Sequence, residues 1–153
     1  MSPDGTLLLS AGQDCVVKVW DLGMRRCIQT IGPEIHLNSR KNSNFHRESI
    51  TSMEMNFDNE LLFTGGRDGT IFRSTLSDAE QLSPSGEPDA HQIYDKIYNF
   101  DNKKQMITAL KYDPLHEKLW VGTPSSTFYC LDLRASGASE FLSVQGLPWM
   151  TDY

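Results

Sequence analysis

Hydrophobic and polar residues alternate with a period of two along much of this chain. In residues 15–20, Val17 and Val19 fall on one face of an extended segment, while Lys18 and Trp20 fall on the other. Such alternation is typical of half-buried β-strands, and helical spacing is nowhere sustained. We therefore predict strands near residues 7–11, 15–20, 26–31, 50–56, 61–64, 70–75, 92–98, 106–112, 118–121, 127–131 and 140–145.

Three segments repeat one pattern, in which an apolar strand is followed by a turn of small residues and a second strand. They are LLLSAGQDCVVKVWDL (residues 7–22), LLFTGGRDGTIFRSTL (61–76) and KLWVGTPSSTFYCLDL (118–133). Aligned on the turn, they match without a gap, and Asp14, Asp68 and Ser125 take the same position. A repeat of this length predicts an architecture of stacked copies of one unit.

The first copy closes its second strand with Trp20-Asp21, after a turn that ends in Asp14. This pattern resembles the WD-repeat β-propeller, in which four antiparallel strands form one blade. The resemblance implies an all-β, partial propeller of about three blades. The first blade is expected to be incomplete, because its leading strand would lie upstream of Met1. Closed propellers use roughly four to eight blades, so we expect a fragment of a longer protein with two open sheet edges.

The expected organisation has five parts. They are a partial blade (1–31), a loop insertion (32–45), a blade interrupted by a second loop at 77–92 (46–98), a degenerate blade (99–145) and a tail (146–153). Both loops are rich in Ser, Asn, Pro and Gly, a composition that does not pack a core. The second loop holds Ser83-Pro84, a minimal proline-directed phosphorylation motif, which gives the hypothesis that this loop is regulated.

His46, Thr64 and Asp68 fit two descriptions. In WD-repeat blades, a His before the first strand, a Ser or Thr in the second strand and an Asp in the next turn form a hydrogen-bonded chain that ends on a Trp. The resemblance therefore implies a structural network, and leaving a buried polar group without a partner costs roughly 1–3 kcal/mol. A catalytic triad also needs an exposed nucleophile and an oxyanion hole, which the sequence does not signal. A hydrolase is the remote alternative, and we expect no enzyme.

The full set of network residues is divided between the first two copies. In the second copy, Ser74 stands where the Trp is expected. The first copy supplies Ser10, Asp14 and Trp20, but no His precedes it. The third copy is degenerate throughout.

Composition narrows the class of partner. A formal net charge of −6 argues against a nucleic-acid surface, and no apolar run approaches the roughly 18 residues of a membrane span. Cys15, Cys27 and Cys130 lack CxxC spacing and fall at predicted strand positions. We read them as buried free thiols in a reducing compartment, which predicts a cytoplasmic or nuclear protein. Neither a metal site nor a cofactor is predicted.

Three less common elements refine the resemblance: Leu-Gly-x-x-Arg-Cys-Ile at residues 22–28, Gly-Gly-Arg-Asp at 65–68 and the Thr-x-Ser-x-Thr turn at 123–127. Over about residues 4–133 the chain is similar to the later blades of the WD repeat-containing protein 48 family. That family is a non-catalytic scaffold that binds and activates ubiquitin-specific proteases. The resemblance implies that Arg67 faces the protease and that Thr51 stands where the family places an aromatic contact.

Two alternatives remain open. Arg67 also fits a solvated turn arginine with no partner role. The chain also fits a WD-repeat scaffold of another complex, such as a ubiquitin-ligase adaptor or an RNA-processing assembly, because fold alone does not choose the partner.

Overall fold

The computed structural model describes residues 1–32, 45–58, 60–76, 94–100, 105–125, 127–134 and 141–145. These residues contain β-strands and turns and no helix, which confirms the all-β prediction. The strands are β1 (Leu7–Ala11), β2 (Val17–Asp21), β3 (Arg26–Ile31), β4 (Ile50–Asn56), β5 (Leu61–Gly66), β6 (Thr70–Thr75), β7 (Tyr94–Asn99), β8 (Ala109–Asp113), β9 (Lys118–Gly122), β10 (Thr127–Asp132) and β11 (Phe141–Gln145).

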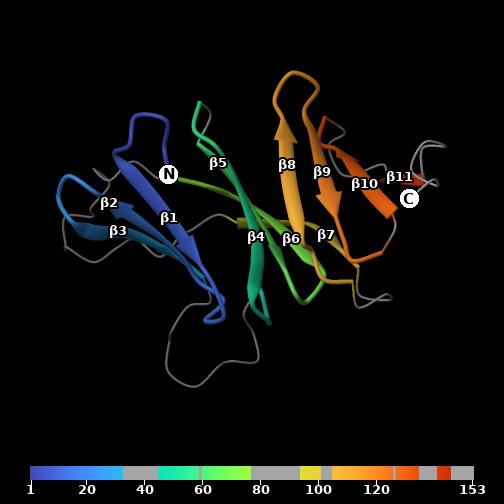
Figure 1. Cartoon of the computed structure of the whole chain (residues 1–153), viewed down its shortest axis with the longest axis horizontal. Helices are drawn as coiled ribbons and strands as arrows, with labels where there is room; N and C mark the ends of the chain where they lie inside the picture. Colours follow the sequence, from blue (N-terminus) through green and yellow to red (C-terminus); the bar gives the residue numbers. More distant parts are fainter. Residues whose placement is uncertain are drawn as a thin grey trace, which may run out of the picture.

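The strands form three antiparallel sheets that lie side by side in chain order (Figure 1). The first sheet has the order β1-β2-β3, the second β4-β5-β6-β7 and the third β8-β9-β10-β11. Each sheet is a meander of neighbouring strands, as in a propeller blade. The fold is therefore a partial propeller with a three-stranded first blade, as predicted.

Two predicted strands begin too early. The strand predicted from residue 106 is β8, which begins at Ala109, and the strand predicted from residue 15 is β2. Cys15 has a φ of 62°, a left-handed conformation that strands exclude. Cys15 and Val16 consequently belong to the turn, and β2 begins at Val17. The two predicted loops and the tail lie outside the described residues, except for Gly32 and Phe45 at the ends of the first loop. Ser83 also lies outside them. Phe45, at the end of the first predicted insertion, is buried in the core.

A main-chain hydrogen bond shows that all three copies keep the same hairpin. The amides of Leu22, Leu76 and Leu133 donate to the carbonyls of Thr6, Glu60 and Glu117, each at 2.9 Å. These six residues occupy equivalent positions in the aligned copies. The third copy, degenerate in sequence, therefore retains the backbone of the repeat.

The hydrophobic core lies between the sheets and is divided into two clusters. The first joins Leu9, Val17 and Val19 of the first sheet to Leu62 and Phe72 of the second. Alternation along β5 then turns the next residue to the other side. The second cluster accordingly joins Phe63 and Ile71 of the second sheet to residues of the third, namely Leu110, Leu119, Val121, Tyr129 and Leu131.

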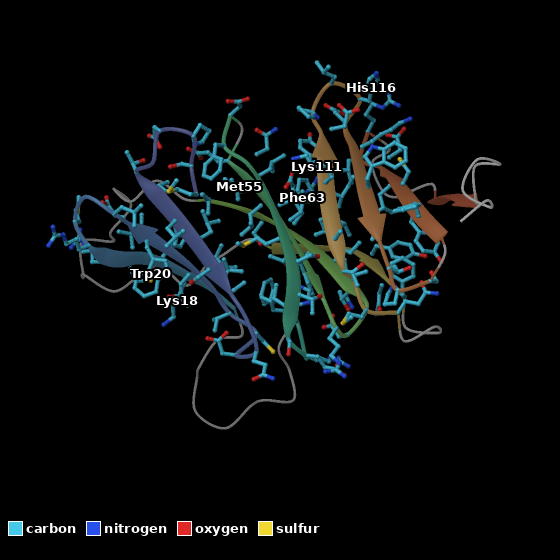
Figure 2. The ribbon with its side chains drawn as sticks, in the orientation of Figure 1. Lys18, Trp20, Met55, Phe63, Lys111 and His116 are labelled. Atoms are coloured by element: carbon cyan, nitrogen blue, oxygen red, sulfur yellow. The ribbon has the colours of Figure 1, made fainter. Side chains whose placement is uncertain are left out.

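The second sheet is therefore buried on both faces. Phe63 of β5 lies between the second and third sheets (Figure 2) and is fully buried. The first and third sheets each have one face covered within the part of the chain that the structure describes.

Equivalent backbone hydrogen bonds tie each sheet to the next. The amide of Ile50, which begins β4, donates to the carbonyl of Gly12 at 3.0 Å. The amide of Ile107, just before β8, donates to the carbonyl of Gly66 at 3.1 Å. Gly12 and Gly66 are the same position in the aligned repeat. The sheet spacing is thus fixed at the turn glycine as well as by side-chain packing.

We expect Phe63→Ala to destabilise the chain by about 3–5 kcal/mol, because truncating a buried aromatic leaves a cavity between two sheets. Leu115→Ala is the matched control, since Leu115 is 89% exposed, and its effect should stay within about 0.5 kcal/mol. Urea unfolding at one fixed protein concentration measures both. Equal stability of the two variants would contradict the placement of Phe63.

Candidate functional site

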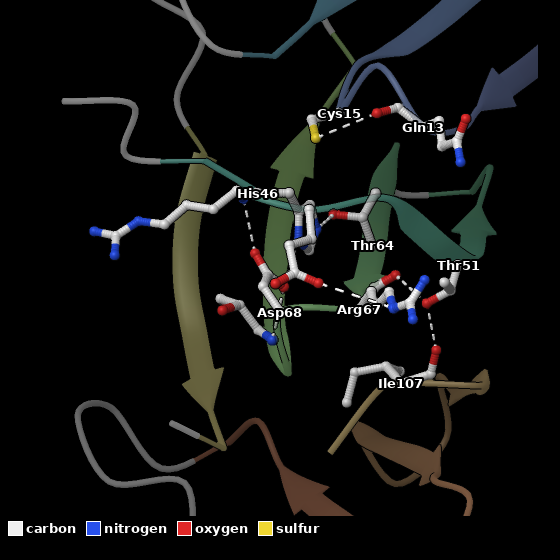
Figure 3. A network of polar contacts seen from close by, with 12 residues as sticks. Gln13, Cys15, His46, Thr51, Thr64, Arg67, Asp68 and Ile107 are labelled. Carbon is white, nitrogen blue, oxygen red and sulfur yellow. Dashed lines mark hydrogen bonds and ion pairs between the residues drawn. The ribbon is translucent and has the colours of Figure 1, made fainter. Parts of the chain in front are cut away.

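The end of the second sheet that carries the β5–β6 turn holds a chain of polar contacts (Figure 3). His46 Nε2 lies 2.9 Å from Thr64 Oγ1, and His46 Nδ1 lies 3.2 Å from Asp68 Oδ1. His46 comes just before β4, Thr64 belongs to β5, and Asp68 lies in the turn. The structure therefore brings together the three residues that the sequence predicted as a network.

Aromatic packing holds the imidazole ring in place. His46 is 1% exposed, and its ring centre lies 4.9 Å from that of Phe45 and 4.8 Å from that of Phe72. Both contacts are edge-to-face, the arrangement that aromatic rings favour. A ring enclosed in this way has two polar atoms to satisfy, and Thr64 and Asp68 satisfy them.

Asp68 connects the turn to the segment that precedes β4. Its carboxylate accepts from the amide of Arg47 at 2.9 Å and from the amide of Thr70 at 3.0 Å, in addition to the contact with His46. Burial raises the pKa of Asp68, but the hydrogen bonds from His46, Arg47 and Thr70 outweigh burial and hold that pKa below its ordinary value. The Asp68 carboxylate is thus charged, and hydrogen bonds within the fold occupy both of its oxygens.

Two glycines make room for these contacts. A Cβ at Gly66 would lie 2.4 Å from His46 Nδ1 and 2.5 Å from Asp68 Oδ1. A Cβ at Gly65 would lie 2.4 Å from a methyl carbon of Ile107, on the opposite face of β5. The Gly-Gly pair is therefore the point at which the network and the third sheet both approach the β5 backbone.

The second copy lacks the tryptophan of the resemblance. Ser74 stands at that position. It is 3% exposed, and its hydroxyl has no hydrogen-bond partner among the described residues. Phe72 and Phe45, whose ring centres lie 4.9 Å apart, pack beside the network instead. Sequence reasoning missed both phenylalanines as network residues, although their positions beside His46 and opposite Thr64 were available as a signal.

The first copy brings together only part of its predicted set. Trp20 Nε1 donates to Ser10 Oγ at 2.9 Å, and the ammonium of Lys18 lies 5.7 Å from the Trp20 ring centre. Asp14 is exposed in the turn and accepts from the amide of Val16 at 3.4 Å. Among the described residues, no hydrogen bond joins Asp14 to Ser10 or Trp20, so the expected three-residue chain is reduced to a pair.

Arg67 projects from the turn between Gly66 and Asp68. Its side chain is 69% exposed, and its Nε lies 4.0 Å from Glu48 Oε2, on a side chain that is 57% exposed. The amide of Arg67 donates to the carbonyl of Ser49 at 2.8 Å. The backbone is fixed by this bond, whereas the guanidinium group points away from the network (Figure 3).

Thr51 has a structural role that the sequence did not indicate. The residue is exposed, but its hydroxyl donates to the carbonyls of Ile107 and Gly65. These bonds clamp the segment before β8 against β5 (Figure 3). Thr51 therefore holds the second and third sheets together at the same end of the molecule as Arg67.

The burial of Thr64 decides between the network and a catalytic triad. Its side chain is 0% exposed, so a substrate has no access to the one hydroxyl that His46 contacts. The arrangement stabilises the fold and does not supply a nucleophile. Among the described residues, no group of three or more His, Cys, Asp or Glu side chains is placed to hold a metal ion. No helix in the described part of the chain is long and apolar enough to cross a membrane.

Two of the three cysteines differ from the prediction of buried free thiols. Cys130 is a buried free thiol, and burial raises its pKa. Cys15 and Cys27 are only half-buried. Cys15 falls in the turn instead of a strand, and burial together with the nearby carboxylates of Asp68, Asp14 and Glu48 raises its pKa. A raised pKa leaves little thiolate at neutral pH, so neither Cys15 nor Cys130 is an activated nucleophile.

Comparisons with known proteins agree with this geometry. The family described as "WD domain, G-beta repeat" matches residues 1–21 and 39–72, which cover the first two copies. Mitochondrial division protein 1 of Saccharomyces cerevisiae (strain YJM789) is 30% identical over 138 residues, 88% of this chain and 17% of that protein. CCR4-associated factor 4 of the same strain is 28% identical over 156 residues, 99% of this chain and 22% of that protein.

A third relative, mitochondrial division protein 1 of Kluyveromyces lactis, is 26% identical over 143 residues, 93% of this chain and 18% of that protein. The chain thus spans about a fifth of the length of the curated relatives it matches. The family match places WD-repeat sequence at residues 1–21 and 39–72, and the three antiparallel sheets are those of a partial WD-repeat propeller.

Two glycines at one repeat position should respond differently to an added methyl group. Gly66→Ala should destabilise the chain by about 1–3 kcal/mol, because the added methyl group collides with His46 and Asp68. Gly12→Ala is the control, since a Cβ there meets nothing within 4 Å, and its effect should stay within about 0.5 kcal/mol. Thermal unfolding at matched concentration measures the difference. Two equal melting temperatures would show that the network does not need the glycine.

The negative charge of Asp68 should contribute to the stability of the fold. Asp68→Asn should cost roughly 1–3 kcal/mol at pH 7, because the amide group accepts these hydrogen bonds less strongly than a carboxylate does. The folded-state pKa of Asp68 is lowered, so its stabilisation is present above the unfolded pKa of about 4 and is lost as pH falls through the folded pKa. The difference in melting temperature between the two proteins should therefore shrink below about pH 4. A difference that does not change between pH 7 and acid would argue against the charged network.

Proposed function

We propose that this chain is part of a non-catalytic WD-repeat scaffold that binds a protein partner at the exposed turn carrying Arg67. The first candidate partner is a ubiquitin-specific protease, which the scaffold binds and activates inside the cell, in the cytoplasm or the nucleus. The support for this partner is the resemblance carried by residues 22–28, 65–68 and 123–127. The support for the surface is the geometry of Arg67.

The exposure of Arg67 on a rigid turn is the observation that carries the proposal. Asp68 and Gly66 fix the turn from within, and Ser49 fixes the Arg67 backbone. An arginine on an ordered backbone loses little further backbone freedom when it binds, and its planar group suits a carboxylate on a partner. The pair with Glu48 is long and exposed at both ends, and pairs of this kind contribute about 0–1 kcal/mol. A partner can therefore replace Glu48 at low cost.

Thr51 contributes to this surface mainly by supporting it. Its hydroxyl bonds to the carbonyls of Ile107 and Gly65. A partner could therefore contact only the methyl group of this side chain. An aromatic residue here would add contact area and remove the clamp between the sheets. For this reason the binding energy of the proposed surface rests on Arg67.

A scaffold of another complex is the second candidate, and the comparisons favour it. Two of the similar proteins are a mitochondrial division protein and a CCR4-associated factor. A ubiquitin-ligase adaptor or an RNA-processing assembly belongs to the same class of function. Fold alone does not choose between these candidates, so the partner has to distinguish them.

Charge reversal of Arg67 in the full-length protein separates the two candidates. Arg67→Glu should weaken the complex with the ubiquitin-specific protease by about 2–5 kcal/mol and remove most of the activation, because an anchoring cation becomes a repelling anion. Its effect on folding stability should stay within about 0.5 kcal/mol. Calorimetric titration gives the affinity, and hydrolysis of a fluorogenic ubiquitin substrate gives the activation.

Arg26→Glu is the matched control, because Arg26 is an exposed arginine on β3 of the first sheet. It makes the same charge change away from the proposed surface. If Arg67→Glu and Arg26→Glu both bind and activate like the unaltered protein, the protease does not use this turn. If the unaltered protein itself neither binds nor activates the protease, the scaffold of another complex becomes the first choice.

A further inference from the structure

A carboxylate of this chain lies beside the guanidinium group of Arg67. Glu48 Oε2 is 4.0 Å from Arg67 Nε. The amide of Arg67 also donates to the carbonyl of Ser49, the residue after Glu48, at 2.8 Å. This main-chain bond holds the segment of Glu48 against the turn, so the approach of the two side chains follows from the fold. A carboxylate is therefore the group that the turn already places next to Arg67.

The pair of Arg67 and Glu48 is loose. Close hydrogen bonds between charged groups span about 2.7–2.9 Å, and the pair of Lys111 and Glu54, which joins β8 to β4, reaches 2.7 Å. Arg67 and Glu48 stay 4.0 Å apart, with side chains that are 69% and 57% exposed. Among the described residues, no hydrogen bond engages the guanidinium group of Arg67, which carries several N–H donors. The group thus lies near a carboxylate without being bound by it.

Arg47 is a second exposed cation at this end of the second sheet. Its amide donates to the carboxylate of Asp68, the residue after Arg67. Both oxygens of Asp68 accept hydrogen bonds within the fold, so Asp68 offers little to a partner. The two core clusters cover both faces of the second sheet, so these exposures hold with a neighbouring sheet packed on each side. The charges that this end of the sheet presents to a partner are therefore Arg47, Arg67 and Glu48.

We propose that an acidic segment of the protein partner binds this turn and that Glu48 competes with it for Arg67. A carboxylate of the partner accepts two parallel hydrogen bonds from the guanidinium group, a geometry that arginine favours and that Glu48 does not reach. Glu48 then turns into solvent and gives up only a weak, exposed pair. This role of Glu48 rests on the proposed function, because it takes the turn of Arg67 as the binding surface.

Glu48 should therefore weaken the binding that Arg67 supports. In the free protein its carboxylate offsets the charge of Arg67, and an acidic segment has to displace it. Because an exposed pair contributes little, the effect on affinity is small, and its sign is what distinguishes the two residues. Removal of the Arg67 charge should weaken binding, whereas removal of the Glu48 charge should strengthen it.

Fluorescence anisotropy of a labelled octapeptide of alternating Glu and Gly, titrated with the full-length protein, tests the competition. Glu48→Gln keeps the size of the side chain and removes its charge, so the dissociation constant should fall about two- to fivefold. The same octapeptide with Gln in place of Glu should bind at least about tenfold more weakly.

Glu60→Gln is the matched control and should leave the dissociation constant unchanged. Glu60 is exposed at the other end of β5, a strand of 6 residues that spans roughly 20 Å. Physiological salt screens charges over about 8 Å, so the charge of Glu60 does not reach the turn of Arg67.

A double substitution separates competition from simple repulsion. Arg67→Gln should weaken binding of the Glu peptide at least about fivefold. Adding Glu48→Gln to Arg67→Gln should give no further gain, because the group under competition is gone. A gain of equal size in both backgrounds would show that Glu48 only repels the peptide. A Glu peptide that does not bind, or that binds the Glu48→Gln and unaltered proteins equally, would also overturn the proposal.

The protease titrations decide the proposed function separately, because they contain no peptide. If Arg67→Glu loses the protease while Glu48→Gln leaves peptide binding unchanged, the binding surface stands and the role of Glu48 is wrong. If the peptide results hold and the unaltered protein does not bind the protease, the partner is another acidic protein. Each substitution changes an exposed side chain, so equal melting temperatures should accompany the changes in affinity and exclude misfolding as their cause.

Discussion

The spacing between neighbouring sheets depends on a close approach at one backbone position, the second small residue of the turn. At Gly66, the carbonyl accepts the amide that leads into β8, while His46 and Asp68 fill the space where a side chain would lie. A residue with a Cβ satisfies only the first of these demands. Gly12 makes the equivalent bond to Ile50 without a network beside it. The inter-sheet bond is thus common to both copies, and the buried network is an addition to it.

Alternation and repetition predicted most of the strands because both are local. Each strand of the first two copies needs only its own residues to show a period of two, and the aligned turns gave the order of the sheets. The start of β2 was placed too early, because Cys15 precedes the alternating residues Val17 and Val19 and was counted with their strand. Cys15 instead has a left-handed backbone conformation and belongs to the turn. The network of His46, Thr64 and Asp68 was likewise available from the sequence, since spacing within one copy defines it.

Contacts between copies were harder to predict. Thr51 and Ile107 lie 56 residues apart, and no pattern in either segment indicates that a hydroxyl of one meets a carbonyl of the other. The packing of Phe45 and Phe72 against His46 was missed for a similar reason, because it joins side chains from separate segments of the chain. Asp14 lies exposed in the turn and accepts from the amide of Val16, so it does not extend the pair of Trp20 and Ser10.

The burial of the second sheet on both faces implies a gradient of local stability along the molecule. Sheets in a stacked array gain stability from each neighbour, and β5 and β6 have one on either side. Amide protons in these two strands should exchange with solvent only through global unfolding. Those of β3 should exchange through smaller, local unfolding events. The turn that carries Arg67 joins β5 to β6. The exposed cation of the proposed surface therefore lies between the two strands whose amide protons should exchange most slowly.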